Sequence, residues 1–196
     1  MHGLINRAIQ CFLRDTYGAD VWARIMQEAD LGYDSFESML IYEESVTFQI
    51  IDIAVAELRK SKDDLLEDLG TYLVSHDNVR ALRRLLRFGG LNFNDFLHSL
   101  DDLQDRARLA VPDLYIPSLQ VDEVQPGEFR VESDDYYPGF GHVMVGIIRG
   151  MADDYGALAF TNIISQAQDG GATISITLLD EDFAMGRSFE LAQKAG

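Results

Sequence analysis

Residues 112–133 of this 196-residue chain have the sequence PDLYIPSLQVDEVQPGEFRVES, and the pattern of the whole chain changes here. From Pro117 to Ser133, apolar and polar residues alternate in short runs separated by Gln125-Pro126-Gly127-Glu128. Alternation with a period of two is typical of half-buried strands, and Pro-Gly is a turn signal. The segment therefore predicts two strands joined by a turn.

The residues before this segment predict helices almost throughout. Apolar residues recur at helical spacing from Leu4 to Tyr17, and Gly18 then has the properties of a helix C-cap. Similar patterns predict further helices at 19–29, from Ser45 or Val46 to about 60, at 63–74, at 78–88, and from Asn92 or Asn94 to about 110.

The residues after this segment predict one long helix and two more strands. The helix covers 137–155, and the strands cover 157–166 and 172–179 around the hairpin signal Asp169-Gly170-Gly171. The order predicts an α+β fold, in which a helical N-terminal subdomain packs on a C-terminal antiparallel sheet crossed by a long helix. We expect one domain over residues 1–186, divided into subdomains 1–60 and 61–186, with a tail at 187–196.

The charge of the chain limits its partners. Sixteen Lys and Arg stand against 33 Asp and Glu, which gives a formal net charge of −17. Such a surface repels phosphate backbones and anionic lipids, so we expect neither nucleic acid nor membrane as a partner. The N-terminus lacks the pattern of a signal peptide, and no apolar run reaches the roughly 18 residues of a membrane span. We therefore expect a cytoplasmic protein.

No arrangement of reactive residues predicts an enzyme. The single cysteine, Cys11, excludes an internal disulfide framework and a metal site built from several cysteines. Pro138-Gly139-Phe140-Gly141 lacks the Lys-Ser end of a phosphate-binding loop and is interpreted as a turn. The four histidines are too scattered for a two-histidine zinc motif; they are His2, His76, His98 and His142.

Several short stretches match one known family in order and spacing. They are MHGLINRAI at 1–9, YGADVW at 17–22, Tyr42 with EES at 43–45, FLHSLDDL at 96–103, Pro112 with PS at 117–118, and VGIIRG at 145–150. Together they resemble heme nitric oxide/oxygen binding (H-NOX) domains, the sensor module also found in soluble guanylate cyclase. The resemblance covers nearly the whole chain.

The resemblance implies a heme between the N-terminal helices and the C-terminal part, held by an axial histidine and by a Tyr-x-Ser-x-Arg motif. It implies pocket positions for Ile5, Ile9, Leu100 and Pro112, with His142 close to the open face of the heme. It also implies gas sensing and signalling to a separate partner, such as a histidine kinase or a cyclic-nucleotide enzyme.

The chain departs from the family at both anchors of the heme. Gln104 stands where the family has its axial histidine, and a side-chain amide is a much weaker iron ligand than an imidazole. The propionate-binding motif falls within 131–138, either on Ser133, Asp135 and Tyr137 or on Glu132, Asp134 and Tyr136. Neither alignment supplies an arginine, and carboxylates there would repel the propionates.

Two hypotheses therefore stay open at this stage. In the first, an altered ligand set binds heme, with His98 as a candidate metal ligand and His142 as a candidate on the other side. His98 precedes Gln104 by six residues, which on one continuous helix places it about 120° from the Gln104 face. In the second, the domain is a heme-free regulator that binds another protein or a small hydrophobic ligand.

Overall fold

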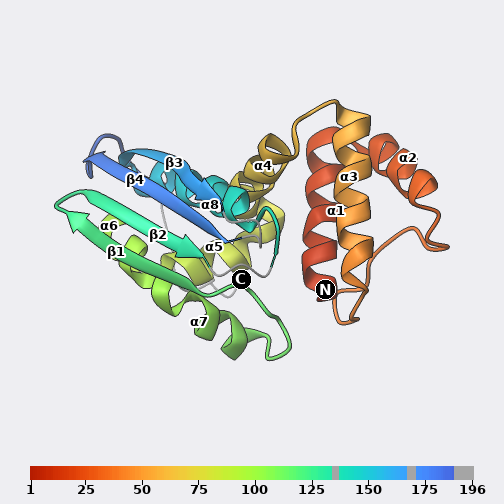
Figure 1. The fold of residues 1–196 in the computed structure, drawn as a ribbon, viewed down its shortest axis with the longest axis horizontal. Coiled ribbons are helices and arrows are strands. Elements are labelled where there is room, and N and C mark those ends of the chain that lie inside the picture. Colours follow the sequence, from red (N-terminus) through yellow and green to blue (C-terminus); the bar gives the residue numbers. More distant parts are fainter. Residues whose placement is uncertain (134–136, 167–170, 188–196) are drawn as a thin grey trace, which may run out of the picture.

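The computed structural model describes residues 1–133, 137–166 and 171–187 (Figure 1). Its helices and strands follow the predicted order. They are α1 (Gly3–Tyr17), α2 (Ala19–Ala29), α3 (Glu44–Leu58), α4 (Lys62–Ser75), the 3-10 turn η1 (Asp77–Val79), α5 (Arg80–Arg87), α6 (Phe93–His98), the 3-10 turn η2 (Ser99–Asp102), α7 (Leu103–Ala110), β1 (Leu119–Gln125), β2 (Glu128–Ser133), α8 (Phe140–Tyr155), β3 (Leu158–Gln166) and β4 (Ala172–Asp180).

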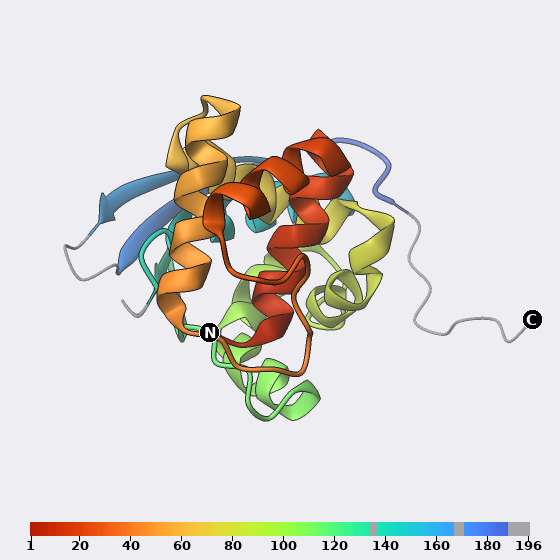
Figure 2. The same cartoon turned by 90° about the vertical axis from the view of Figure 1, so that its right-hand side faces the viewer.

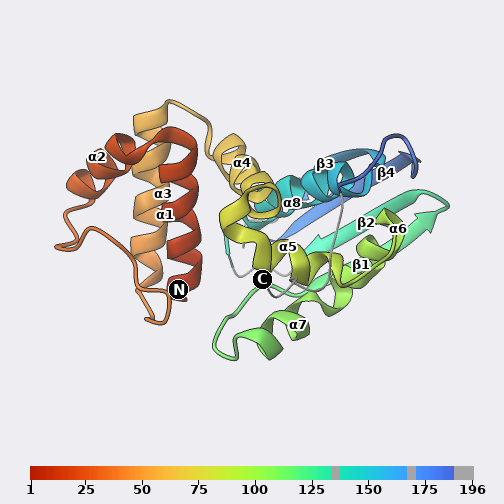
Figure 3. The ribbon, with the colours of Figure 1, turned by 180° about the vertical axis from the view of Figure 1, so that it is seen from behind.

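The strands form one antiparallel sheet in the order β1-β2-β4-β3. Val131 of β2 lies between Val121 of β1 and Ile174 of β4. Figures 1 and 3 show α5, α6 and α8 on one face of this sheet. The inward side chains of β2 and β4 are fully buried against these helices, so the α+β fold class is confirmed.

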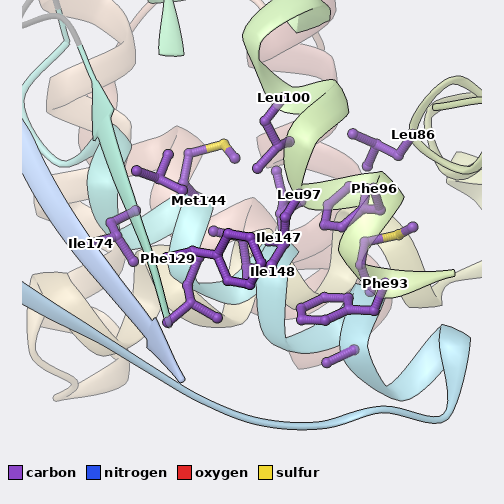
Figure 4. Close-up of a cluster of buried hydrophobic side chains, with 14 of the residues drawn as sticks. Leu86, Phe93, Phe96, Leu97, Leu100, Phe129, Met144, Ile147, Ile148 and Ile174 are labelled. Carbon is purple, nitrogen blue, oxygen red and sulfur yellow. The ribbon is translucent and has the colours of Figure 1, made fainter. Parts of the chain in front are cut away.

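The apolar core consists of two clusters. The N-terminal cluster contains side chains of α1, α2, α3 and one face of α4, and these helices stand together in Figure 2. The C-terminal cluster lies between α8, the sheet and the segment from α5 to α7, and Figure 4 shows many of its side chains. Leu73 and Val143 pack against both clusters, so α4 and α8 form the joint between the two parts. The subdomain boundary at residue 60 stays a prediction, because α4 contributes to both sides.

Glycines allow α4 and α8 to cross at very short range. A Cβ atom added to Gly146 would overlap the carbonyl oxygen of Glu67, and one added to Gly70 would overlap that of Val143. The two backbones are therefore in direct contact at this crossing, as at other small-residue helix interfaces.

The helix predicted from Asn92 to about 110 is interrupted, which corrects our expectation. Asn92 does cap α6, accepting a hydrogen bond from Asp95 N, but the 3-10 turn η2 separates α6 from α7. Arg106 donates to the carbonyl oxygen of Ser99 inside this turn. His98 and Gln104 consequently do not share one regular helix, and the 120° estimate does not apply.

Two smaller differences concern the ends of predicted elements. The helix expected at 78–88 begins with the turn η1, and the one expected from 137 begins at Phe140. Asp169 and Gly170 of the predicted hairpin lie outside the described residues, as does most of the tail. Within the described residues, no helix combines the length and the hydropathy needed to cross a bilayer.

Candidate functional site

Gln104 forms a hydrogen bond to the polypeptide backbone. It is half-buried in the first turn of α7, and its Nε2 donates to the carbonyl oxygen of Ile116 at 2.8 Å. The amide thereby ties α7 to the irregular segment 111–118 that leads into β1. A side-chain amide with a backbone partner of this quality is a structural contact.

The two prolines of this segment differ in burial. Pro112, which we expected in the pocket, is exposed after the end of α7, and a role in pressing on a buried group does not fit this position. Pro117 is buried and lies two residues before Leu119, the first residue of β1. Both prolines belong to the stretches that resemble the family, and their burial in the folded chain is what distinguishes them.

His98 lies on the sheet side of α6. Its Nε2 is 3.7 Å from Glu123 Oε2 of β1, and its ring meets the Phe129 ring edge-on with the centroids 5.6 Å apart. The side chain is half exposed. His98 therefore lies beside the β1–β2 hairpin, and its role as a metal ligand stays a prediction.

His142 is buried in a polar cluster that joins α4, α8 and β3. Its Nδ1 lies 3.1 Å from Glu67 Oε1, and its Nε2 lies 3.3 Å from Asp63 Oδ1 and 2.7 Å from Gln166 Nε2. Arg149 bonds Glu67 as well and donates to Thr161 O at 2.8 Å. Both ring nitrogens therefore face protein partners, and His142 connects α4, α8 and β3.

The expected apolar pocket residues do not converge. Ile9 belongs to the N-terminal cluster and Ile5 packs against it, whereas Leu100 is fully buried in the C-terminal cluster. Ile9 also lines a cavity of about 10 Å³ together with side chains of α1, α3 and α4. That volume holds roughly one water molecule.

The positions expected to replace the propionate-binding motif are described only in part. Ser133 is buried, and its Oγ accepts a hydrogen bond from Ala172 N at 3.2 Å, which links β2 to β4. Tyr137 meets the Tyr115 ring edge-on at 5.9 Å. Glu132 is exposed, and Asp134, Asp135 and Tyr136 lie outside the described residues.

A second polar cluster, which the sequence did not reveal, fixes α1 to α4. Tyr72 Oη donates to Asp15 Oδ2 at 2.6 Å, and Asn78 Nδ2 donates to the same oxygen at 2.7 Å. The Tyr72 hydroxyl lowers the pKa of Asp15, while burial, followed by the bond to Asp15, raises the pKa of Tyr72. The sequence predicted the helix that carries Tyr72, but no pattern connected Tyr72 to an acid 57 residues away.

These contacts allow a test of whether heme fits this chain. The axial position carries an amide already bonded to Ile116, and His98 and His142 both have protein partners elsewhere. The residues present therefore do not fit a heme held by an imidazole.

Two apolar clusters joined at α4 and one antiparallel sheet define an α+β domain. A family model described as Haem-NO-binding matches residues 2–159, so the chain belongs to that family, whose members are sensors of nitric oxide or oxygen. The resemblance inferred from the sequence is confirmed.

Relatives and solved structures agree with this assignment. Soluble guanylate cyclase 89Da of Drosophila melanogaster is 22% identical over 92% of this chain and 27% of its own length. Soluble guanylate cyclase gcy-32 of Caenorhabditis elegans is 24% identical over 78% of this chain and 23% of its own length. The chain thus spans about a quarter of these relatives.

Among solved structures, the Fe(II) unliganded H-NOX protein from K. algicida superposes with a TM-score of 0.79. It is 17% identical to this chain, and the match covers 94% of this chain and all of that one. The I5F mutant of T. tengcongensis H-NOX gives a TM-score of 0.77 at 15% identity, over 92% of this chain and 99% of that one. At these identities the likeness shows the fold alone.

Proposed function

We propose that this chain is a regulatory domain of the H-NOX type that acts on a separate signalling protein without a histidine-ligated heme. The observation that carries the proposal is the hydrogen bond from Gln104 Nε2 to Ile116 O. The side-chain amide at the family's axial position is therefore already bonded to the backbone. The positions of His98 and His142 support it, since neither imidazole is free to replace the missing ligand.

The relatives support one class of partner. Those named above are guanylate cyclases, which supports a cyclic-nucleotide enzyme as the partner, and a histidine kinase is the other class we consider. The net charge of −17 favours a partner with a basic docking face and disfavours nucleic acid and membrane. A cytoplasmic setting stays part of the proposal.

The joint at α4 supplies a route by which the two parts influence each other. Tyr72 and Asp15 fix α1 to one side of α4, while Gly70 and Gly146 bring α8 against the other side. A partner that displaces the N-terminal helices must therefore move α4 against α8 or break these contacts. We infer that partner binding, and not a change at an iron, sets the relative position of the two parts.

Titration of the purified protein with hemin, followed by visible absorption, tests the proposal. We expect no Soret band that saturates at one equivalent, although far-ultraviolet circular dichroism shows a folded chain. A sharp stoichiometric band that is lost in His98→Ala or in His142→Ala would overturn the proposal.

A matched variant tests the role of Gln104 itself. Gln104→His places an imidazole at the axial position, and we expect it to take up more hemin than the wild type. Gln104→Ala removes the bond to Ile116 without adding a ligand and serves as the control. Equal hemin uptake by Gln104→His and Gln104→Ala would contradict the inference that Gln104 is the reason why the chain lacks a histidine-ligated heme.

A further inference from the structure

The two edges of the sheet differ in how they are protected. At the β1 edge, Val121 N donates to Asp101 Oδ1 at 2.6 Å, so part of this edge is already bonded to η2. β1 also carries Asp122 and Glu123. Capping groups and charges are the usual means by which proteins prevent an edge strand from pairing with another chain.

The β3 edge lacks the charged residues that β1 carries. Leu158–Gln166 contains no charged residue and no proline, and the described strands pair β3 only with β4 (Figure 1). Phe160 and Ile164 are 62% and 57% exposed. An irregular register near Ile164 and the bond from Arg149 to Thr161 O are the protective features that we find there in the described part of the chain.

Charge makes this edge suitable for contact between two copies. The chain carries a net charge of −17, so most pairs of faces would bring carboxylates together. The nine residues of β3 carry none, so this strand itself adds no charge repulsion between two copies. Covering the exposed side chains of Phe160 and Ile164 would also remove apolar surface from water.

The sequence of β3 is also complementary to itself. In an antiparallel pair centred on Asn162, Phe160 lies opposite Ile164 of the second copy, and the same pair forms again across the two-fold axis. Aromatic and β-branched residues are favourable partners in directly opposite positions. We propose that two copies of this chain pair through their β3 edges and join their sheets into one continuous antiparallel sheet.

The expected strength follows from the size of the contact. One strand pair buries less surface than a standard interface, so we expect a dissociation constant on the order of 10 μM. The remaining surfaces repel each other, and salt screens that repulsion. The dimer should therefore become more stable as the salt concentration rises. This inference is independent of the question of heme.

Analytical ultracentrifugation of the full chain over a concentration series tests it, at about 0.05 M and about 0.5 M NaCl. We expect a monomer–dimer equilibrium that shifts toward dimer at the higher salt concentration. Phe160→Lys should raise the dissociation constant at least about tenfold. Leu109→Lys is the matched control, because Leu109 is an apolar residue 87% exposed on α7, and it should leave the equilibrium unchanged.

Ile164→Lys provides a second variant if circular dichroism shows that Phe160→Lys does not fold. A monomer at all concentrations would overturn the proposal, as would equal weakening by Phe160→Lys and Leu109→Lys. A chain that stays monomeric but binds an extended basic peptide at this edge, with affinity falling as salt rises, would also overturn it. That result would identify a different occupant.

Discussion

At the scale of single residues, Gln104 shows how one substitution changes the chemistry of a position while its place in the fold is kept. An imidazole offers a lone pair to a metal, whereas the Gln104 amide donates its N–H to Ile116 O. The resemblance to the family was enough to show that Gln104 stands in place of the axial histidine. It did not identify the partner, because that partner is a backbone atom of an irregular segment.

Tyr72→Phe tests the bond between α4 and α1. The substitution removes the hydroxyl that donates to Asp15 Oδ2 at 2.6 Å and keeps the ring in the core. We expect a loss of about 1–2 kcal/mol in the free energy of unfolding at pH 7, since the acceptor is a carboxylate. Urea denaturation followed by circular dichroism measures this loss.

The same variant has a defined pH dependence. The folded-state pKa of Asp15 lies below its ordinary value of 3.8, mainly because of the Tyr72 hydroxyl. The stabilisation is therefore complete above that value and is lost as the pH falls through the lower folded-state pKa. The difference between wild type and Tyr72→Phe should shrink under those acidic conditions, and a constant difference would contradict this account. Tyr33→Phe is the control, because it removes a hydroxyl from a tyrosine that is 37% exposed.

At the scale of elements, the α4–α8 crossing depends on residues without a side chain. Gly146→Ala places a methyl group against the carbonyl oxygen of Glu67, which is part of a helix and has little room to move. We expect a loss of about 3 kcal/mol in the free energy of unfolding, because the two helices must separate. The urea midpoint measures it.

Gly18→Ala separates this packing effect from backbone strain. Gly18 has φ 99° and no neighbour within contact distance of an added Cβ atom, so only the backbone conformation opposes the substitution. We expect that variant to lose about 1 kcal/mol. If Gly146→Ala lowered the free energy of unfolding no more than Gly18→Ala does, the inference that α4 and α8 are in direct backbone contact would be wrong.

The elements also show what the sequence could predict. Periodicity located α1, α2, β2 and β4 to within a residue or two, because one face of each is apolar and their ends carry turn or cap residues. It missed the break between α6 and α7, since Arg106 and Ser99 make that turn through side-chain contacts. The sequence also could not predict the partners of His142, because Glu67 and Gln166 belong to elements distant from it in the chain.

At the scale of the whole molecule, the two apolar clusters share one helix. α4 contributes Leu65 and Leu69 to the N-terminal cluster and Val74 to the C-terminal cluster. Neither cluster can remain packed if α4 unfolds. The two parts should therefore lose their structure together, although each has a core of its own.

Trp22 makes this cooperativity measurable. It is the one tryptophan of the chain, is 6% exposed and lies in the N-terminal cluster, so its fluorescence reports on that part alone. We expect the urea transitions from Trp22 fluorescence and from circular dichroism, which reports on all helices and strands, to coincide. Gly146→Ala, whose clash lies at the joint, should lower both midpoints by the same amount. A fluorescence midpoint that stayed at the wild-type value in this variant would show that the N-terminal helices fold independently of α4 and α8.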